Sequence, residues 1–263
     1  MSDPALLVTT DSRGVATVTL NRPEKRNALD DRQVRALTEA FATLDRDPDV
    51  RAIVLAGRGQ AFSAGADLDY MQRMASASEG ENIIDATAIA EMLRALDRLG
   101  KPTIARVHGA AYAAGIGLVA ACDTVVASDQ ATFCVSEVRV GMVPSTISPY
   151  VIAAIGAKAA RHYFLTAEPM SAADALRLGL AHRVVAPADL DAAVESVLSA
   201  LLRGAPKAQG RAKQLIADLV YRSVDDEMVA ITARSIAAAR ASPEGREGIA
   251  AFLSKRKPSW HAG

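Results

Sequence analysis

The sequence has few of the residues and patterns that metal, redox or disulfide chemistry requires. Among its 263 residues there are two cysteines, Cys122 and Cys134, in apolar surroundings and without Cys-x-x-Cys spacing. Two buried thiols are therefore favoured over a metal or redox site, and a reducing compartment is weakly indicated. The four histidines are scattered and form no His-x-x-x-His or His-Glu-x-x-His pattern, so no metal site is expected.

Excess charge and long apolar runs are also absent. Lys and Arg total 30, and Asp and Glu total 30, so no basic surface for nucleic acid is indicated. No apolar run reaches the roughly 18 residues that a membrane helix needs. The first residues, MSDPALLVTTDSRG, show no charged-then-apolar signal pattern. We expect a cytoplasmic protein that has neither a nucleic-acid partner nor a membrane association.

Two common catalytic patterns are missing as well. Neither Ser63 nor Ser136 sits in a Gly-x-Ser-x-Gly elbow, which disfavours a serine hydrolase. No Gly-x-Gly-x-x-Gly follows the first predicted strand, so a dinucleotide-binding fold is only weakly indicated.

The hydrophobic patterns that are present predict an α/β core followed by helices. Short apolar or alternating runs predict strands, longer runs of helical period predict helices, and their alternation predicts an α/β architecture. The predicted strands are 6–11, 15–23, 50–59, 101–109, 123–128, the extended piece 131–138 and, among the later helices, 181–187. The predicted helices are 28–47, 81–100, 115–121, 148–167, 171–180, 188–205, 206–223, 224–242 and 243–258.

Two segments of similar design each follow a predicted strand. They are GQAFSAGADL (59–68) and HGAAYAAGIGL (108–118), and both join a strand to the start of a helix through small residues. Small residues can simply allow close strand–helix packing. Two such turns side by side can also aim two backbone N–H groups at one oxygen atom, which is the geometry of an oxyanion hole.

Four ordered motifs carry a resemblance to a known family. They are LNRPEKRNAL (20–29), FSAGADL (62–68), HGAAYAAGIGLVAACD (108–123) and FCVSEVRVGMVP (133–144). In this order and spacing the chain resembles the crotonase, or enoyl-CoA hydratase/isomerase, superfamily. Within it, the chain is most similar in character to bacterial 3-methylglutaconyl-CoA or carboxygeranoyl-type hydratases.

The resemblance implies a fold and an assembly. It implies the crotonase (ClpP-like) fold, with a core of repeated ββα units over 1–195 and a helical C-terminal trimerisation region over 196–263. It implies a homo-oligomer, a trimer or hexamer, that takes an acyl-CoA thioester. No cofactor is implied, because coenzyme A is part of the substrate.

The resemblance also implies roles for particular residues. The N–H groups of Ala66 and Ala114 would hold the thioester oxygen, and Glu137 would be the catalytic acid/base. The substrate-binding positions that it implies are Lys25, Arg26, Ala28, Ala64, Asp67, Leu68, Gly117, Ser136, Arg139 and Ser145. On a strand, Glu137 and Arg139 would share a face, where the arginine could pair with a substrate carboxylate or lower the pKa of the glutamate. The Ser145 N–H could hold the attacking water.

One position departs from the two-glutamate pattern of well-known hydratases in this family. The second glutamate should lie three residues after Ala114, where this chain has Gly117. The single Glu137 is compatible with a one-glutamate hydratase in fatty acid or branched-chain amino acid breakdown. It is also compatible with an isomerase that moves a double bond, which needs one base and an oxyanion hole. An inactive acyl-CoA-binding relative is a third alternative.

Overall fold

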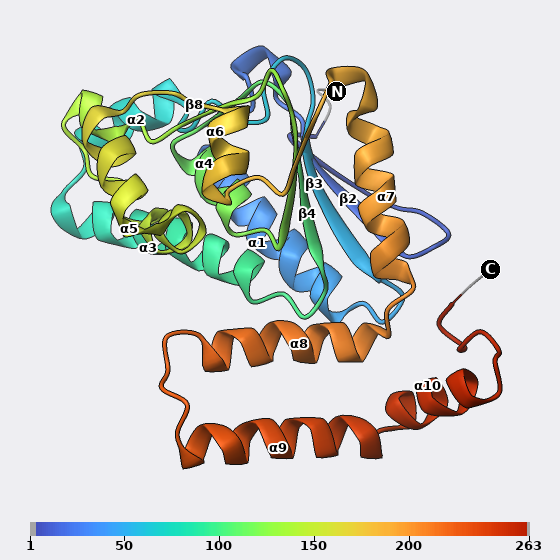
Figure 1. Ribbon diagram of the computed structural model, residues 1–263. Helices are drawn as coiled ribbons and strands as arrows, with labels where there is room; N and C mark the ends of the chain where they lie inside the picture. The colour runs from blue at the N-terminus through green and yellow to red at the C-terminus, as the bar shows by residue number, and fades with distance from the viewer. Residues whose placement is uncertain (1–3, 262–263) are drawn as a thin grey trace.

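A six-stranded sheet with helices on both faces forms the centre of the molecule (Figure 1). The computed structural model describes residues 4–261. The first two strands form an antiparallel hairpin, as predicted, and the later strands add in parallel. In spatial order the strands are β1 (Leu6–Thr10), β2 (Val15–Leu20), β3 (Ala52–Gly57), β4 (Thr103–Val107), β6 (Thr124–Ser128) and β9 (Arg183–Val185).

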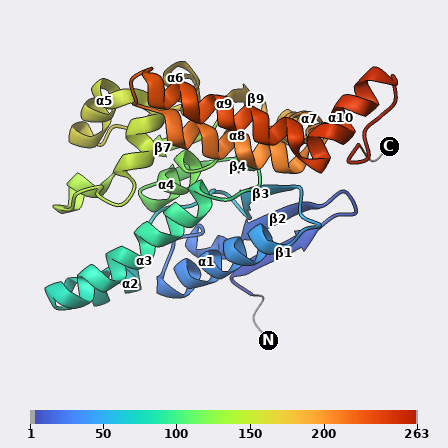
Figure 2. The same ribbon diagram turned by 90° about the horizontal axis from the view of Figure 1, so that it is seen from below.

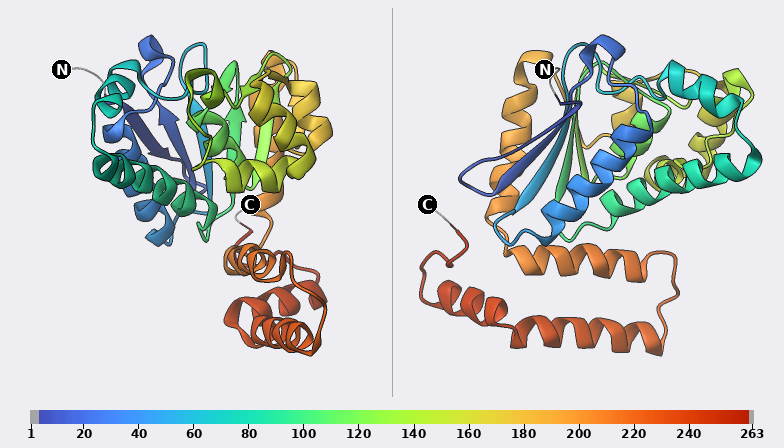
Figure 3. Two further views of the ribbon diagram at one scale, coloured as in Figure 1. Left: turned by 90° about the vertical axis from the view of Figure 1, so that its left-hand side faces the viewer. Right: turned by 180° about the vertical axis from the view of Figure 1, so that it is seen from behind.

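The central strands are apolar because helices cover both faces of the sheet. On one face, Val194 and Leu198 of α7 (Leu190–Leu202) pack with Val54 of β3. The opposite face meets α1 (Asp31–Arg46), α3 (Glu79–Asp97) and α4 (Ala114–Ala120), as the two views of Figure 3 show. A strand covered on both sides has no solvent face, so β3 reads as a continuous apolar run.

A second, small sheet joins a segment that the sequence predicted as a turn to part of the extended piece predicted over 131–138. It consists of β5 (Ala110–Tyr112), β7 (Thr132–Cys134) and β8 (Met170–Ser171) in the order β5–β7–β8. Its strands are two or three residues long, too short to leave a periodic signal. The extended piece predicted over 131–138 is therefore only partly correct, because the chain leaves β7 and forms the 3₁₀ helix η2 (Glu137–Val140).

The remaining predicted helices are confirmed. Pro and Ser residues cap several of them, as at Ser171 and Ser242, whose side chains accept the first free N–H groups. The elements not yet bounded are η1 (Pro23–Lys25), α2 (Leu68–Ala75), α5 (Ser148–Thr166), α6 (Ala172–Leu178) and η3 (Pro187–Asp189). Within residues 4–261, no helix combines the length and the apolar character needed to cross a membrane.

The C-terminal helices form a separate layer below the core. They are α8 (Pro206–Leu219), α9 (Asp226–Ala241) and α10 (Pro243–Leu253), with α8 and α9 side by side in the view from below (Figure 2). The guanidinium of Arg51 ties this layer to the sheet by donating to the carbonyl oxygens of Leu202, Gly204 and Trp260. The division of the chain at residue 195 stays a prediction; that residue lies inside α7.

Candidate active site

Two turns lie side by side at the carboxyl ends of β3 and β4, which are hydrogen-bonded neighbours. Ser63 in the first turn pairs with Ala111 in the second: its N–H donates to Ala110 O over 3.0 Å, and its carbonyl accepts from Tyr112 N over 2.9 Å. These bonds bring together the two small-residue segments that the sequence singled out.

Glycines allow the two turns to approach this closely. A Cβ on Gly65 would lie 3.0 Å from the Ala113 Cβ, and Gly65 has a φ of +99°, which favours glycine. A Cβ on Gly115 would lie 2.8 Å from Ser63 O. The prediction that small residues serve close backbone approach is therefore confirmed at both turns.

The first turn leaves the N–H of Ala66 without a protein acceptor. Ala66 pairs with Leu29, whose N–H donates to Gly65 O over 2.6 Å and whose carbonyl accepts from Asp67 N over 2.8 Å. In such a parallel bridge the flanking residues make the bonds, so the N–H of Ala66 points away from Leu29. Within residues 4–261 the Ala66 N–H donates no hydrogen bond.

The second turn presents the N–H of Ala114 at the start of α4. Ala113 has φ 46° and ψ −120°, an uncommon backbone conformation for a residue with a side chain. It is held there by its own N–H, which donates to Cys134 O over 2.9 Å. Ala114 opens the helix, so its N–H has no acceptor within α4, and it donates to no other described residue. Two free N–H groups thus stand on adjoining turns, as an oxyanion hole requires.

The small sheet brings Glu137 to the same place. Strand β7 pairs in parallel with β5, and Cys134 lies opposite Tyr112. Ala114 is two residues after Tyr112 and Glu137 is three residues after Cys134, so both follow the same end of the small sheet. Glu137 is half-buried, and its Oε2 is buried without a hydrogen-bond partner among the described residues. Burial raises the pKa of the Glu137 carboxyl, which the nearby N–H groups of Ser136 and Glu137 offset only in part. A carboxyl group in this state is suited to accepting and returning a proton.

Gly117 faces a side chain rather than open space. A Cβ placed on this glycine would overlap the Cγ2 of Ile147 and lie 3.0 Å from its Cβ. Ile147 is buried at the start of α5, where it packs in the main core. The position where a second carboxylate would be carried is therefore filled by an apolar side chain.

The expectation that Glu137 and Arg139 share one face of a strand is wrong. Because these residues lie on the 3₁₀ helix η2 and not on a strand, a spacing of two does not place them on one face. The Arg139 guanidinium instead donates to Ala167 O over 2.5 Å, and Arg139 is not among the groups that shift the pKa of Glu137, which is raised and not lowered. The N–H of Ser145 is also engaged, since it donates to Val143 O over 2.7 Å and is not free to hold a water.

The substrate-binding positions implied in the first motif lie along the first turn. The N–H of Ala64 donates to Arg26 O over 2.9 Å, so the segment 22–30 runs beside 64–67. Ala28 is buried in this segment, whereas Leu68 is 80% exposed at the start of α2. Lys25 is exposed, and its ammonium contacts the carboxylates of two aspartates, Asp67 and Asp69.

Sequence reasoning missed several residues that hold these turns. Asn27 is fully buried, and its side-chain amide nitrogen donates to Ala61 O and Arg58 O. The backbone carbonyl oxygen of Asn27 accepts from the Ser63 hydroxyl. Arg22 is the other such residue, and its side chain is only 14% exposed. The signal available in the sequence was an Asn and an Arg within LNRPEKRNAL, but such residues are usually exposed, so burial could not be read from it.

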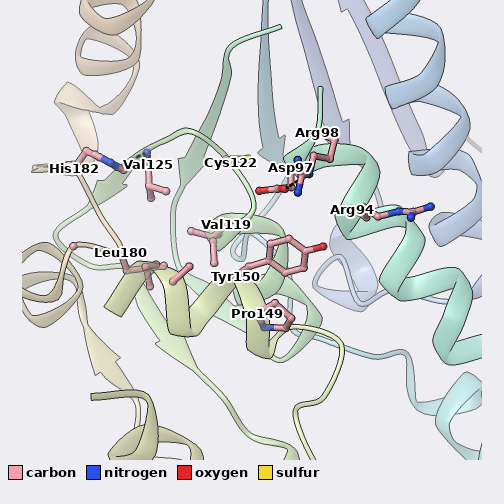
Figure 4. A pocket seen from close by; sticks show the side chains of 14 residues that line it. Arg94, Asp97, Arg98, Val119, Cys122, Val125, Pro149, Tyr150, Leu180 and His182 are labelled. Carbon is pink, nitrogen blue, oxygen red and sulfur yellow. Dashed lines mark hydrogen bonds and ion pairs between the residues drawn. The ribbon is translucent and has the colours of Figure 1, made fainter. Parts of the chain in front are cut away.

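The cavity shown in Figure 4 lies elsewhere. It measures about 610 Å³ and is bounded by α3, the end of α4, the start of α5 and the segment before β9, with Arg94, Cys122, Tyr150 and His182 among its lining. Glu137, Ala66 and Ala114 do not line it. Among residues 4–261, no cluster of three or more His, Cys, Asp or Glu side chains could hold a metal ion.

Comparison with known proteins points to one family. The family model described as enoyl-CoA hydratase/isomerase matches residues 10–263. A crystal structure of an enoyl-CoA hydratase from Mycobacterium smegmatis is 41% identical, with a TM-score of 0.93 over 99% of this chain and 100% of that one. Another, from Shewanella pealeana, is 38% identical, with a TM-score of 0.95 over 98% of this chain and 96% of that one.

A curated relative from Danio rerio extends the likeness. The enoyl-CoA hydratase domain-containing protein 3, mitochondrial, is 32% identical over 258 residues, covering 97% of this chain and 88% of that protein. Together with the structural matches, it confirms the predicted crotonase fold.

Proposed function

Since the chain belongs to the enoyl-CoA hydratase/isomerase family, we propose that it is an enoyl-CoA hydratase that adds water to an α,β-unsaturated acyl-CoA thioester. One observation carries the proposal: within residues 4–261, a carboxyl group with a buried, unpartnered oxygen follows the small sheet at the end where two adjoining turns present N–H groups without an acceptor. The former can move a proton, and the latter can hold an oxygen on which negative charge grows.

The proposed reaction uses Glu137 twice. Water attacks the β-carbon while the Glu137 carboxylate takes one of its protons, and the electrons of the double bond move onto the thioester oxygen. The N–H groups of Ala66 and Ala114 stabilise the resulting enolate. Glu137 then returns the proton to the α-carbon, the enolate collapses to the thioester, and the carboxylate is restored. The net change is addition of one water across the double bond.

A double-bond isomerase is the second candidate. Because a Cβ at position 117 would overlap Ile147, there is no room for a second glutamate at that position, and isomerisation needs only one carboxyl group, that of Glu137. In that reaction Glu137 would take a proton from the α-carbon and return it to the γ-carbon.

The acyl group that we propose is apolar. Beyond Glu137 the chain exposes apolar side chains at Val140, Met142 and Val143, which suit an aliphatic acyl chain. A carboxylated, branched substrate such as 3-methylglutaconyl-CoA was expected from the resemblance and from Arg139. Because that guanidinium donates to Ala167 O, it supports such a substrate less than the sequence suggested.

The proposal also covers the assembly and its surroundings. A trimer or hexamer is supported by large apolar side chains left exposed on the C-terminal layer, which a neighbouring copy would cover. They include Ile216, Val220, Tyr221, Val229, Ile236, Ile249, Phe252 and Leu253. Sedimentation of the purified protein tests this, and a monomer at micromolar concentration would contradict it. A cytoplasmic location, the absence of a cofactor and a place in fatty acid or branched-chain breakdown stay predictions.

The decisive experiment follows the absorbance of the conjugated enoyl thioester. Crotonyl-CoA and 3-methylglutaconyl-CoA are each mixed with the protein, with Glu137→Gln as the catalytic variant and Glu39→Gln, an exposed residue of α1, as the matched control. Loss of absorbance that depends on Glu137 supports hydration. No loss with either substrate, together with a gain of absorbance from a 3-enoyl-CoA, would replace the hydratase by an isomerase. If the protein binds the acyl-CoA thioesters but converts none of them, the result would favour an inactive acyl-CoA-binding protein.

A further inference from the structure

Arg22 joins four acceptors from the first motif, the start of α1 and the first turn. Its Nη1 donates to Ala28 O (3.2 Å), Asp30 Oδ2 (2.9 Å) and Gln33 Oε1 (3.1 Å), and its Nη2 donates to Asp67 Oδ2 (2.7 Å). The side chain of Asp67 is 3% exposed, so the Arg22–Asp67 pair is largely shielded from water. A shielded, charge-assisted hydrogen bond from a planar guanidinium constrains both position and direction.

Asp67 transmits this constraint to the backbone. It directly follows Ala66, and its N–H donates to Leu29 O. The other carboxylate oxygen of Asp67 accepts from Asp69 N over 2.9 Å, and this hydrogen bond caps the start of α2. The peptide on either side of Ala66 is thus held, by Leu29 through the backbone and by Arg22 through the Asp67 side chain.

We infer that Arg22 is a positioning residue that orients the Ala66 N–H toward the thioester oxygen by clamping Asp67. The inference rests on the proposed function, because it assigns Ala66 to the oxyanion hole. Arg22 does not touch the reacting atoms. The guanidinium acts through Asp67, and the distance and direction of one N–H donor depend on it.

The expected effect follows from how strongly an oxyanion donor depends on geometry. Loss of such a donor lowers kcat by about 100- to 1000-fold, and a displacement of about 1 Å can cost about 100-fold. We therefore expect Arg22→Gln to lower kcat by about 10- to 100-fold while KM changes by less than about threefold. Asp67→Asn, which keeps the size of the side chain but removes the ion pair, should act in the same direction.

The test compares Arg22→Gln, Arg22→Lys and Asp67→Asn with Arg35→Gln. Arg35 is a matched control, because its side chain is 62% exposed on α1 and, among residues 4–261, forms an ion pair with Asp31 alone. Two quantities are measured on the full chain: kcat and KM with crotonyl-CoA, and the absorbance of a bound chromophoric enoyl thioester, which shifts to the red when its carbonyl oxygen is polarised. Arg22→Lys should recover part of both, since an ammonium keeps the positive charge but lacks the two separate nitrogens with which the guanidinium reaches Asp30 and Asp67.

The inference predicts that kcat and the red shift fall together in Arg22→Gln and Asp67→Asn and stay unchanged in Arg35→Gln. It is overturned if the red shift persists in both variants, or if KM rises while kcat is unchanged, which would place Arg22 in CoA binding. If Arg22→Gln does not fold, Asp67→Asn decides. A wild-type protein that red-shifts the thioester but does not hydrate it would refute the hydratase and leave the inference standing. A wild-type protein that gives no red shift would overturn the inference.

Discussion

Gly117 and Ile147 occupy one space: a Cβ on the glycine would overlap the Cγ2 of the isoleucine. The glycine lies in α4, one turn after Ala114, and the isoleucine caps the start of α5. The contact explains why the site offers one carboxyl group, because no longer side chain can stand at position 117 unless Ile147 moves. It also makes the helix pair sensitive to small changes in volume.

Gly117→Ala should lower the free energy of unfolding by about 1–3 kcal/mol, as overpacking of a core does. Urea unfolding followed by circular dichroism measures this. Gly80→Ala is the control, since a Cβ on Gly80 in α3 meets nothing within 4 Å and should be neutral or slightly stabilising. In the double variant with Ile147→Ala the two losses should not add, because the new methyl group fills part of the cavity. Strict additivity would show that the two residues do not share space.

Glu137→Gln should be more stable than the wild type at neutral pH although it is inactive. The folded-state pKa of Glu137 is raised by burial, so the charged form destabilises the fold. Below the unfolded-state pKa of about 4.3 both states are protonated and no penalty exists; the penalty grows as the pH rises toward the folded-state pKa. Thermal unfolding at pH 7 and pH 4 checks the sign. The prediction is contradicted if Glu137→Gln is less stable than the wild type and if this loss of stability is larger at pH 7 than at pH 4.

The same raised pKa sets the expected acid limb of activity. Hydration needs Glu137 as carboxylate when water attacks, so kcat/KM should fall with decreasing pH at a value above that of an ordinary glutamate. A pH profile of kcat/KM with crotonyl-CoA measures it. An acid limb at or below about pH 4.3 would indicate that Glu137 is solvated in the free enzyme.

Asp67 should stabilise the fold down to strongly acidic pH. Although burial opposes it, hydrogen bonds from Lys25 and Arg22 lower the pKa of Asp67 to about 2. A lowered folded-state pKa gives stability that is complete above the unfolded value of 3.8 and is lost as the pH falls toward 2. The difference in unfolding free energy between the wild type and Asp67→Asn should therefore be constant from pH 5 to 7 and shrink between about pH 4 and 2. A difference that is independent of pH over the whole range would mean that charge is not its cause.

Arg51→Ala should loosen the C-terminal layer from the core. The guanidinium donates to three carbonyl oxygens, at Leu202, Gly204 and Trp260, which would lose their donor. Leu202, Gly204 and Trp260 are half-buried, so loss of these hydrogen bonds weakens the contact between the layers. We expect faster proteolytic cleavage near residues 203–206, compared with the wild type and with Arg32→Ala, an exposed residue of α1. Equal cleavage rates would show that other contacts hold the layer.

The sequence by itself determined the alternation of strands and helices and the two small-residue turns. Those features depend on neighbours in the chain: the apolar period of a helix, the apolar run of β3, and the glycines that permit a turn. The sequence also indicated Glu137 as a candidate, since it lies in one of the motifs that carry the resemblance; its catalytic role stays a prediction.

Only the tertiary structure determined which residues from distant parts of the chain contact one another. After β7, the chain turns into η2 because the partner strand β5 ends at Tyr112, and this separates Arg139 from the Glu137 carboxyl. The burial of Arg22 depends on an aspartate 45 positions away. The reason why position 117 holds a glycine is the side chain of Ile147, whose position is set by the packing of α5. Local periodicity carries no record of such contacts, because they form only when distant segments fold together.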